Sequence, residues 1–163
     1  MQKIPIGILG ATGMVGQQFV RLLTNHPWFD ITVLAASEAS KNKTYAKAAA
    51  GRWFWESEIP TTVRDIQIMD AVADQVEIAK KVRLVFSAIS LEKEATKALE
   101  SAYARLGVAV VSNNSAHRST PDVPMIIPEI NADHAAIIDA QRKQRGWTTG
   151  LIAVKPNCSL QSY

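Results

Sequence analysis

The chain has 163 residues, 47% of them hydrophobic, which is enough for one well-cored domain and too few for two. Its formal net charge is +3 and the charges are interspersed, so no basic run indicates a nucleic-acid interface. No window reaches the roughly 18 apolar residues of a membrane span, and the N-terminus lacks the pattern of a signal peptide, so we expect a soluble, cytoplasmic protein.

Strand and helix patterns alternate along the chain. Short apolar runs bounded by turn residues predict buried strands over residues 4–9, 31–36, 66–69, 84–87, 108–111 and 151–154. Helical spacing predicts helices from Val15 to the His26-Pro27 stop and over residues 71–80, 92–105 and 132–145. Strands separated by helices predict an α/β fold with a Rossmann-like, doubly wound parallel sheet.

The first helix carries its apolar residues at i, i+4, i+7 and i+8, so the face that packs on the sheet is predicted to consist of Val15, Phe19, Leu22 and Leu23. A polar, lysine-containing stretch follows the second strand, from Ser37 to about Lys47. Beyond it, Trp53, Phe54 and Trp55 form a compact aromatic patch.

A glycine-rich loop joins the first strand to the first helix, with the sequence Gly10-Ala11-Thr12-Gly13-Met14-Val15-Gly16. Glycines let the backbone turn tightly and approach a pyrophosphate, while a helix N-terminus offers free N–H groups and the positive end of its dipole. The spacing differs from the usual G-x-G-x-x-G, so a tight structural turn remains the alternative to a dinucleotide site.

The residues after the second strand bear on the choice between NAD and NADP. Enzymes that use NAD usually place a carboxylate there for the ribose 2′-hydroxyl. Here the strand is followed by Ser37, Ser40, Lys41 and Lys43, whose hydroxyl and ammonium groups suit a 2′-phosphate. Glu38 lies in the same stretch and could contact a ribose, and a solvated lysine-rich loop is the other alternative, but we favour NADP.

The one cysteine, Cys158, follows the last predicted strand in Lys155-Pro156-Asn157-Cys158-Ser159. A single cysteine excludes an internal disulfide and suits a reducing compartment. At a strand-to-helix junction a thiolate is favoured by the helix dipole, although a lone cysteine is more often a small buried apolar residue. The three histidines, His26, His117 and His134, show no metal-ligand spacing, and we expect them at the surface or in caps, with no metal site.

Three segments together resemble aspartate-semialdehyde dehydrogenase, especially its archaeal and fungal-like branch. They are the glycine loop, the stretch Val111 to Arg118 with Asp122-Val123-Pro124, and Pro156-Asn157-Cys158-Ser159. Supporting matches are Val85-Phe86-Ser87-Ala88, Ile127-Pro128-Glu129-Ile130-Asn131 and Gln141-Arg142-Lys143. The similarity covers nearly the whole chain.

The resemblance implies a reversible, NADP-dependent reduction of aspartyl 4-phosphate to aspartate 4-semialdehyde, on the route to lysine, threonine and methionine. Cys158 would be the nucleophile, and Arg118 and Asn113 would lie around the phosphate, where a guanidinium fork suits phosphate oxygens. A solvated loop arginine is the alternative for Arg118. The residues expected on the cofactor side are Gly10, Thr12, Gly13, Met14, Val15, Ser37, Ser40, Lys43, Ser87 and Ala88.

The sequence also departs from the family. Ala39 stands where an arginine is frequent, which weakens the case for a 2′-phosphate, Ser90 replaces a common proline, and Lys155 replaces a usual asparagine. Family members are about twice as long, with a second domain that supplies a catalytic histidine, a substrate arginine and most contacts of a homodimer or homotetramer. We therefore interpret residues 1–154 as the dinucleotide-binding domain and 155–163 as the start of the catalytic segment, and expect no turnover by this chain alone.

Two other hypotheses remain open. A relative could reduce another acyl phosphate or an acyl-CoA, as malonyl-CoA reductase and, more distantly, N-acetylglutamyl-phosphate reductase do. Alternatively, the chain could be a non-catalytic nucleotide-binding module. All of these bind small molecules, and none requires a nucleic acid or a membrane.

Overall fold

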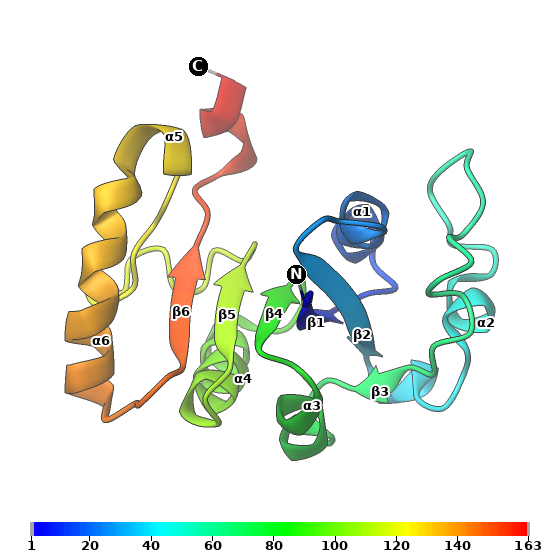
Figure 1. The fold of residues 1–163 in the computed structure, drawn as a ribbon, viewed down its shortest axis with the longest axis horizontal. Coiled ribbons are helices and arrows are strands. Elements are labelled where there is room, and N and C mark those ends of the chain that lie inside the picture. Colours follow the sequence, from blue (N-terminus) through cyan, green and yellow to red (C-terminus); the bar gives the residue numbers. More distant parts are fainter. Residues whose placement is uncertain (1, 163) are drawn as a thin grey trace. The chain divides into compact units, whose positions relative to one another are not determined.

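The computed structural model describes residues 2–162. The chain divides into two compact units, Met1–Ser90 and Leu91–Tyr163. The described part contains six β-strands, four in the first unit and two in the second, and the strand pairs within each unit are parallel. The predicted α/β class with a Rossmann-like parallel sheet is therefore confirmed (Figure 1). The predicted domain boundary at residue 154 lies inside the second unit and stays a prediction.

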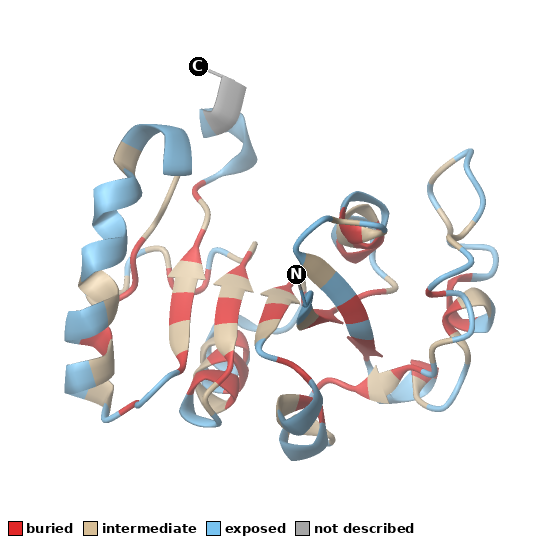
Figure 2. Ribbon diagram, viewed as in Figure 1, coloured by how far each residue is buried: buried red, intermediate tan, exposed pale blue. Residues whose placement is uncertain are grey.

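The first unit is a four-stranded sheet in the order β3-β2-β1-β4. Consecutive residues near the ends of β1 and β2 are buried, as in strands covered on both faces (Figure 2). Helices α1 and α3 both pack on β1 and β2. The elements of this unit are β1 (Ile4–Leu9), α1 (Met14–Leu23), β2 (Phe29–Ala36), the 3-10 turn η1 (Glu38–Ser40), α2 (Tyr45–Ala49), β3 (Met69–Asp70), α3 (Gln75–Lys81) and β4 (Leu84–Ser87).

The buried face of α1 differs from the predicted one. Leu23 is buried as predicted and Phe19 packs partly buried against the core, but Val15 and Leu22 are 41% and 63% exposed, and Gly16 and Val20 face the core instead. A Cβ atom on Gly16 would lie 2.1 Å from the carbonyl oxygen of Gly10. This close approach fixes the rotation of the helix about its axis, so the residues one and two turns after Gly16 are the ones that reach the sheet.

The second unit pairs β5 with β6 and packs α4 and α6 against them. Glu92 caps α4, since its carboxylate accepts the backbone N–H of Glu94 at 2.8 Å, and α6 ends at Gly146, whose φ is +66°. The elements are α4 (Lys93–Arg105), β5 (Ala109–Ser112), α5 (Pro128–Asn131), the 3-10 turn η2 (Ala132–Ala136), α6 (Ile137–Arg145), β6 (Leu151–Val154) and the 3-10 turn η3 (Cys158–Ser162).

The side chains of Gln141 and Arg142, in α6, bind backbone groups of β6 and of the turn before it. The buried Gln141 side chain donates to the Ile152 carbonyl at 3.0 Å and accepts the Ile152 N–H at 2.8 Å, as a neighbouring strand would. Arg142 donates to the carbonyls of Thr149 and Gly150 at 2.9 and 3.1 Å. These backbone groups would otherwise be left without protein partners, so the pair has a structural role.

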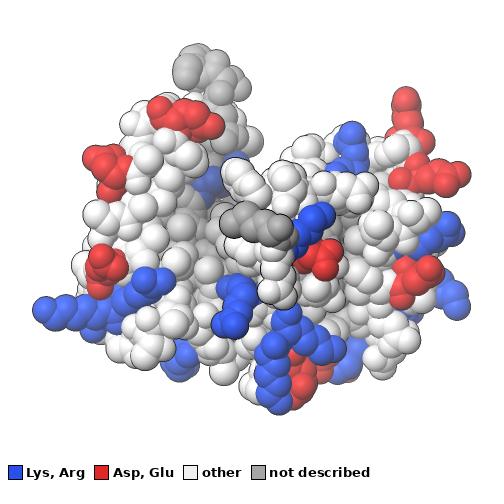
Figure 3. All heavy atoms as spheres, viewed as in Figure 1, with Lys and Arg blue, Asp and Glu red and all other residues white. Residues whose placement is uncertain are grey.

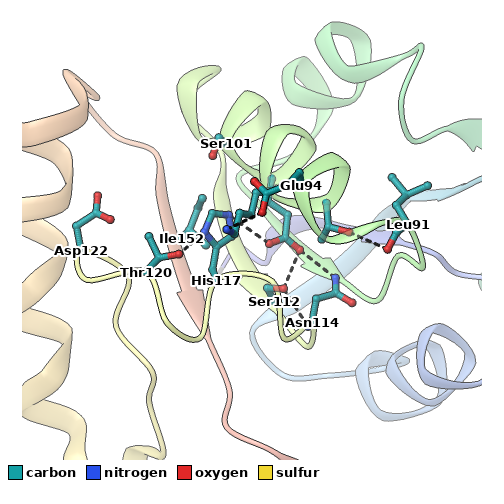
Figure 4. Close-up of polar contacts among 12 residues, drawn as sticks. Leu91, Glu94, Ser101, Ser112, Asn114, His117, Thr120, Asp122 and Ile152 are labelled. Atoms are coloured by element: carbon teal, nitrogen blue, oxygen red, sulfur yellow. Dashed lines mark hydrogen bonds and ion pairs between the residues drawn. The ribbon is translucent and has the colours of Figure 1, made fainter.

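A buried polar network lies under the loop that follows β5 (Figure 4). Glu100 of α4 is fully buried and accepts hydrogen bonds from the Ser112 hydroxyl at 2.7 Å and the Asn114 amide at 3.0 Å. His117 is 2% exposed, with its Nε2 3.9 Å from a Glu100 oxygen and its Nδ1 3.3 Å from Thr120 Oγ1. The expectation of a surface or capping role for His117 is therefore wrong, because the loop folds this ring inward onto Glu100.

The predicted bounds match β1, β4 and β6 to the residue and β2, α4 and β5 to within two residues, and they are less accurate for β3, α3 and α6. Residues 66–69 form a strand only at Met69, since the register with β2 covers just Met69 and Asp70. Helix α3 begins at Gln75 rather than at residue 71, and residues 132–136 form a 3-10 turn before α6. Within residues 2–162, every helix is too short or too polar to span a bilayer.

We expect Gly16→Ala to lower the free energy of unfolding by about 1–3 kcal/mol, because the added methyl group collides with backbone and overpacking has that typical cost. The collision outweighs the gain of about 1 kcal/mol that alanine brings to a helix interior. The matched control is Gly13→Ala, whose Cβ would meet only the Gly10 carbonyl oxygen at 3.5 Å. Urea unfolding followed by circular dichroism measures both, and equal stability of the two variants would contradict the prediction.

His117 should make the stability of the second unit depend on pH below 6.5. Burial lowers the pKa of His117 from its usual 6.5 and the charge of Arg145 adds to the lowering, whereas the Glu100 carboxylate and a hydrogen bond to the Lys97 backbone oppose it. Between the two pKa values the unfolded chain binds a proton that the folded one does not, so stability falls as pH falls from 6.5, with a slope of at most about 1.4 kcal/mol per pH unit.

The free energy of unfolding in urea is measured between pH 5 and 7.5 for the wild type and for His117→Gln, and its pH dependence should be weaker in the variant. The exposed His134, changed to glutamine, is the control and should leave the slope as in the wild type. The paired carboxyls Asp74 and Asp122 have pKa values below 3.8 and so titrate outside this window. An unchanged slope in His117→Gln would contradict the assignment.

Candidate functional site

The glycine loop turns tightly because of two close backbone approaches. Gly10 has φ +79°, and a Cβ there would lie 2.4 Å from the carbonyl oxygen of Ala88. Gly16 also lies too close to the Gly10 backbone to carry a side chain, as described for α1. Gly13 differs, since it is exposed and a side chain would meet nothing closer than 3.5 Å. The open side of the loop is therefore at Gly13, where a ligand could reach the backbone.

The N-terminus of α1 suits an anion. Gly13 is the N-cap and provides no side-chain cap, and the first turn of this ten-residue helix carries no acidic residue. The N–H groups of the first turn have no intrahelical acceptor, and the helix dipole adds partial positive charge there. Thr12 is partly exposed, and Gly13, Met14 and Val15 are exposed. These residues fit the pyrophosphate of a dinucleotide, which would supply the missing acceptors and the negative charge.

Hydrogen bonds attach the loop to both neighbouring strands. The N–H groups of Gly10 and Ala11 donate to the Ala35 carbonyl at 2.8 and 3.0 Å, and the Ala88 N–H donates to the Leu9 carbonyl at 2.9 Å. The structure thus brings Gly10, the end of β2 and Ala88 to one edge of the sheet. Ser87 is fully buried, while Ala88 is partly exposed.

The predicted 2′-phosphate residues lie in the turn after β2. Ser37 and Lys43 are exposed, whereas Ser40 is only 4% exposed. Lys41 forms an ion pair of 2.7 Å with Asp74, and this hydrogen bond raises the pKa of Lys41. The Lys43 ammonium donates to the Ala39 carbonyl at 2.8 Å and is the exposed cation of this turn. Glu38 is also exposed here, and the roles of all these residues stay predictions.

Sequence reasoning missed two buried residues that contact the loop. The Tyr45 hydroxyl donates to the Ala11 carbonyl at 3.0 Å, and the Gln17 amide donates to the Thr12 carbonyl at 2.9 Å. A glutamine among the buried residues of α1 was the available signal, because a buried polar side chain needs a specific partner.

In the second unit, the loops that follow β5 and β6 are joined by Arg118. Its guanidinium donates to the carbonyls of Lys155 and Asn113 at 3.2 and 3.4 Å, and the Lys155 N–H donates to the Ser112 carbonyl at 3.1 Å. Asn113 and Arg118 are both partly exposed. The structure thus brings the two predicted phosphate-binding residues together, beside the segment that leads to Cys158.

Cys158 is exposed, and its thiol donates to the Asn157 side-chain oxygen at 3.2 Å. Three residues outside any helix or strand separate it from β6, and it begins the short 3-10 turn η3. It is therefore not the small buried residue that a lone cysteine usually is. A turn of five residues offers little dipole, so the support expected from a helix N-terminus is weak.

The described residues contain no group of three or more His, Cys, Asp or Glu side chains that could hold a metal ion. Figure 3 shows acidic and basic side chains interspersed over the face in view, as the sequence predicts. The N-terminus of α1 can support anion binding, and the exposed Cys158 thiol can support nucleophilic attack.

Comparison with known proteins identifies the family. The family described as semialdehyde dehydrogenase, NAD binding domain, matches residues 5–138. An aspartate-semialdehyde dehydrogenase from Archaeoglobus fulgidus is 41% identical over 157 residues, which is 96% of this chain and 43% of that protein. A malonyl-CoA reductase (NADP) from Metallosphaera sedula is 38% identical, over 98% of this chain and 42% of that protein.

A solved structure supports the same assignment. The crystal structure of aspartate-semialdehyde dehydrogenase with NADP from Candida albicans superimposes with a TM-score of 0.83 at 34% identity, over 97% of this chain and 44% of that one. The chain thus spans less than half the length of the relatives it matches. The resemblance seen in the sequence is confirmed, and the chain belongs to the semialdehyde dehydrogenase NAD-binding-domain family.

Proposed function

We propose that this chain binds NADP and carries the nucleophile of an enzyme that reduces aspartyl 4-phosphate to aspartate 4-semialdehyde. The observation that carries the proposal is the exposed Cys158 thiol, three residues after the Lys155 carbonyl that the Arg118 guanidinium binds at 3.2 Å. The residues that we propose as nucleophile and as phosphate-binding group thus lie on two loops that are hydrogen-bonded to each other. The name of the relatives, aspartate-semialdehyde dehydrogenase, supports the choice of substrate, and we propose that the reaction lies on the route to lysine, threonine and methionine.

Cys158 would act by covalent catalysis. Its thiolate attacks the acyl carbon of aspartyl phosphate, the carbon–oxygen bond to phosphate breaks, and a thioester to Cys158 remains. A nicotinamide cofactor held by the glycine loop would supply the hydride that reduces this thioester. The resulting thiohemiacetal oxyanion re-forms its carbonyl group and expels the Cys158 thiolate, which releases the aldehyde and restores the nucleophile.

Arg118 and Asn113 would bind the leaving phosphate. A guanidinium offers five N–H donors, and Arg118 commits two of its nitrogens to the Lys155 and Asn113 carbonyls. These contacts hold the planar group in one orientation, so its remaining donors can meet phosphate oxygens without first losing side-chain freedom. Its partial exposure leaves it accessible to a ligand.

Gly10 and residues 12–15 would hold the pyrophosphate, and Ser87 and Ala88 would lie on the cofactor side. Ser37, Ser40 and Lys43 would contact the 2′-phosphate, with the Lys43 ammonium replacing the arginine that relatives frequently have at Ala39. We also propose that the intact enzyme is a homodimer or homotetramer in the cytoplasm, and that the 163 residues alone do not turn over.

The similarity to malonyl-CoA reductase favours one alternative, a reductase of an acyl-CoA. Both reactions would form a thioester on Cys158, and they differ in the acyl group and in the leaving group, which is phosphate in one and coenzyme A in the other. Assays with an acyl phosphate and with malonyl-CoA therefore distinguish the two, and only an acyl phosphate makes the reverse reaction depend on inorganic phosphate.

We expect Cys158→Ser to lower phosphate-dependent oxidation of aspartate semialdehyde by about 10³-fold or more, because the nucleophile is removed. The assay uses this chain joined to the segment that follows the matched part of the Archaeoglobus fulgidus relative, with the 163 residues alone as the inactive reference.

Cys158 is exposed, so the variant should fold normally. Ser159→Ala, in the same exposed turn, is the control and should retain activity. Full activity in Cys158→Ser would refute covalent catalysis at this residue.

We expect the chain to bind NADPH more tightly than NADH in a fluorescence titration. Lys43→Gln should weaken NADPH binding about 10-fold, as loss of one charged hydrogen bond does, and leave NADH binding unchanged. Lys47→Gln, also an exposed lysine, is the control. A preference for NADH would instead favour a contact between Glu38 and the ribose, and equal effects of Lys43→Gln on both nucleotides would show that Lys43 does not recognise the 2′-phosphate.

A further inference from the structure

Two consecutive carbonyl groups of the glycine loop point into the first unit. The Ala11 carbonyl accepts the Tyr45 hydroxyl at 3.0 Å, and the Thr12 carbonyl accepts the Gln17 amide at 2.9 Å. Ala11, Tyr45 and Gln17 are all 0% exposed. The inner side of the loop is therefore held by side-chain donors that solvent cannot replace.

These two bonds determine where the backbone N–H groups of the loop point. In a trans peptide the C=O and N–H point in opposite directions, and the described residues contain no cis peptide bond. With the Ala11 carbonyl held by Tyr45, the N–H of Thr12 points away from the core. The next N–H, of Gly13, donates to the Gly10 carbonyl at 3.1 Å and closes the turn. The Thr12 N–H is thus presented on the side of the loop where the first turn of α1 offers its own donors.

The Tyr45 hydroxyl does more than fill space. Its ring packs edge-to-face on Trp53 with 6.3 Å between centroids, a contact that phenylalanine could make equally well. Burial raises the pKa of the Tyr45 phenol, so the hydroxyl remains a proton donor throughout the physiological range. The function of the hydroxyl group is therefore its bond to the loop.

Gln17 uses its whole amide group for the same purpose. Its Nε2 also donates to the Arg52 carbonyl at 2.8 Å, and its Oε1 accepts the Phe54 N–H at 3.0 Å. The side chain thereby attaches the glycine loop to the segment from Arg52 to Phe54. A leucine or methionine would fill this buried helix position without such bonds, so the amide indicates a requirement on backbone geometry.

We propose that Tyr45 and Gln17 are positioning residues that orient the glycine loop, so that the Thr12 N–H and the first turn of α1 together bind the pyrophosphate of the dinucleotide. The inference rests on the proposed cofactor role of this loop. The two side chains act through the Ala11 and Thr12 peptides and do not touch the ligand themselves. A loop already held in its binding conformation loses less conformational freedom when a ligand arrives.

The test is NADPH affinity of Tyr45→Phe, measured by fluorescence titration, together with affinity for adenosine 2′-monophosphate, measured by displacement of NADPH. The second nucleotide carries the 2′-phosphate but no pyrophosphate. We expect the NADPH dissociation constant to rise about 3- to 10-fold, the effect of one lost hydrogen bond, and the constant for adenosine 2′-monophosphate to stay unchanged. Gln17→Met, which keeps the length of the side chain, should show the same selectivity. Tyr103→Phe, at a buried tyrosine of the second unit, is the control and should change neither constant.

Each other outcome has a definite meaning. Equal weakening of both nucleotides would show that the two residues only support the fold, and unchanged NADPH binding in Tyr45→Phe would show that the loop needs no such support. Either result overturns the inference while the cofactor role stands. Absence of NADPH binding by the wild-type chain would overturn the cofactor role and the inference with it.

Discussion

The contact between the backbones of Gly10 and Gly16 determines much of the first unit. The space between these two backbones is too small for a methyl group, so α1 begins directly against the glycine loop that precedes it. That contact sets the rotation of α1, directs Val20 and Leu23 to the sheet and leaves Met14 and Val15 exposed at the helix N-terminus. The same constraint therefore produces both the packing of the helix and the open donor groups that suit a phosphate.

The sequence predicts the position of an element well where the local residue pattern determines it, and less well where contacts with distant parts of the chain determine it. Strands such as β4 were predicted to the residue, because a buried run between turn residues has one interpretation. The buried face of α1 was not, because apolar spacing favoured Val15 and Leu22 whereas a glycine contact decides the rotation. His117 was likewise misplaced, since its burial depends on Glu100, a charged residue 17 positions earlier in the chain that composition alone would place at the surface.

The candidate site shows the same division. Residues with a recognisable motif, such as Gly13, Arg118 and Cys158, could be chosen from the sequence, and the structure brings Arg118 and Asn113 together. Tyr45 could not be chosen in that way, because it lies 34 positions along the chain from the Ala11 that it binds, and Gln17 could not, because its burial shows only in the folded chain. Sequence motifs identify the residues that contact a ligand. The side chains that hold those residues in place are recognised only from the packing of the folded chain.

Both parts of the proposed chemistry use side chains to fix backbone groups. In the first unit Tyr45 and Gln17 bind loop carbonyls, and in the second Arg118 binds the Lys155 and Asn113 carbonyls. Under Arg118, the Glu100 network fixes the start of the same loop through Ser112 and Asn114. Phosphate groups are bound by donors of fixed direction, and a loop supplies such donors only if its conformation is held from the inner side. Several buried polar side chains, which cost stability unless they are hydrogen-bonded, are therefore used in the described part of the chain to hold loops that leave the sheet.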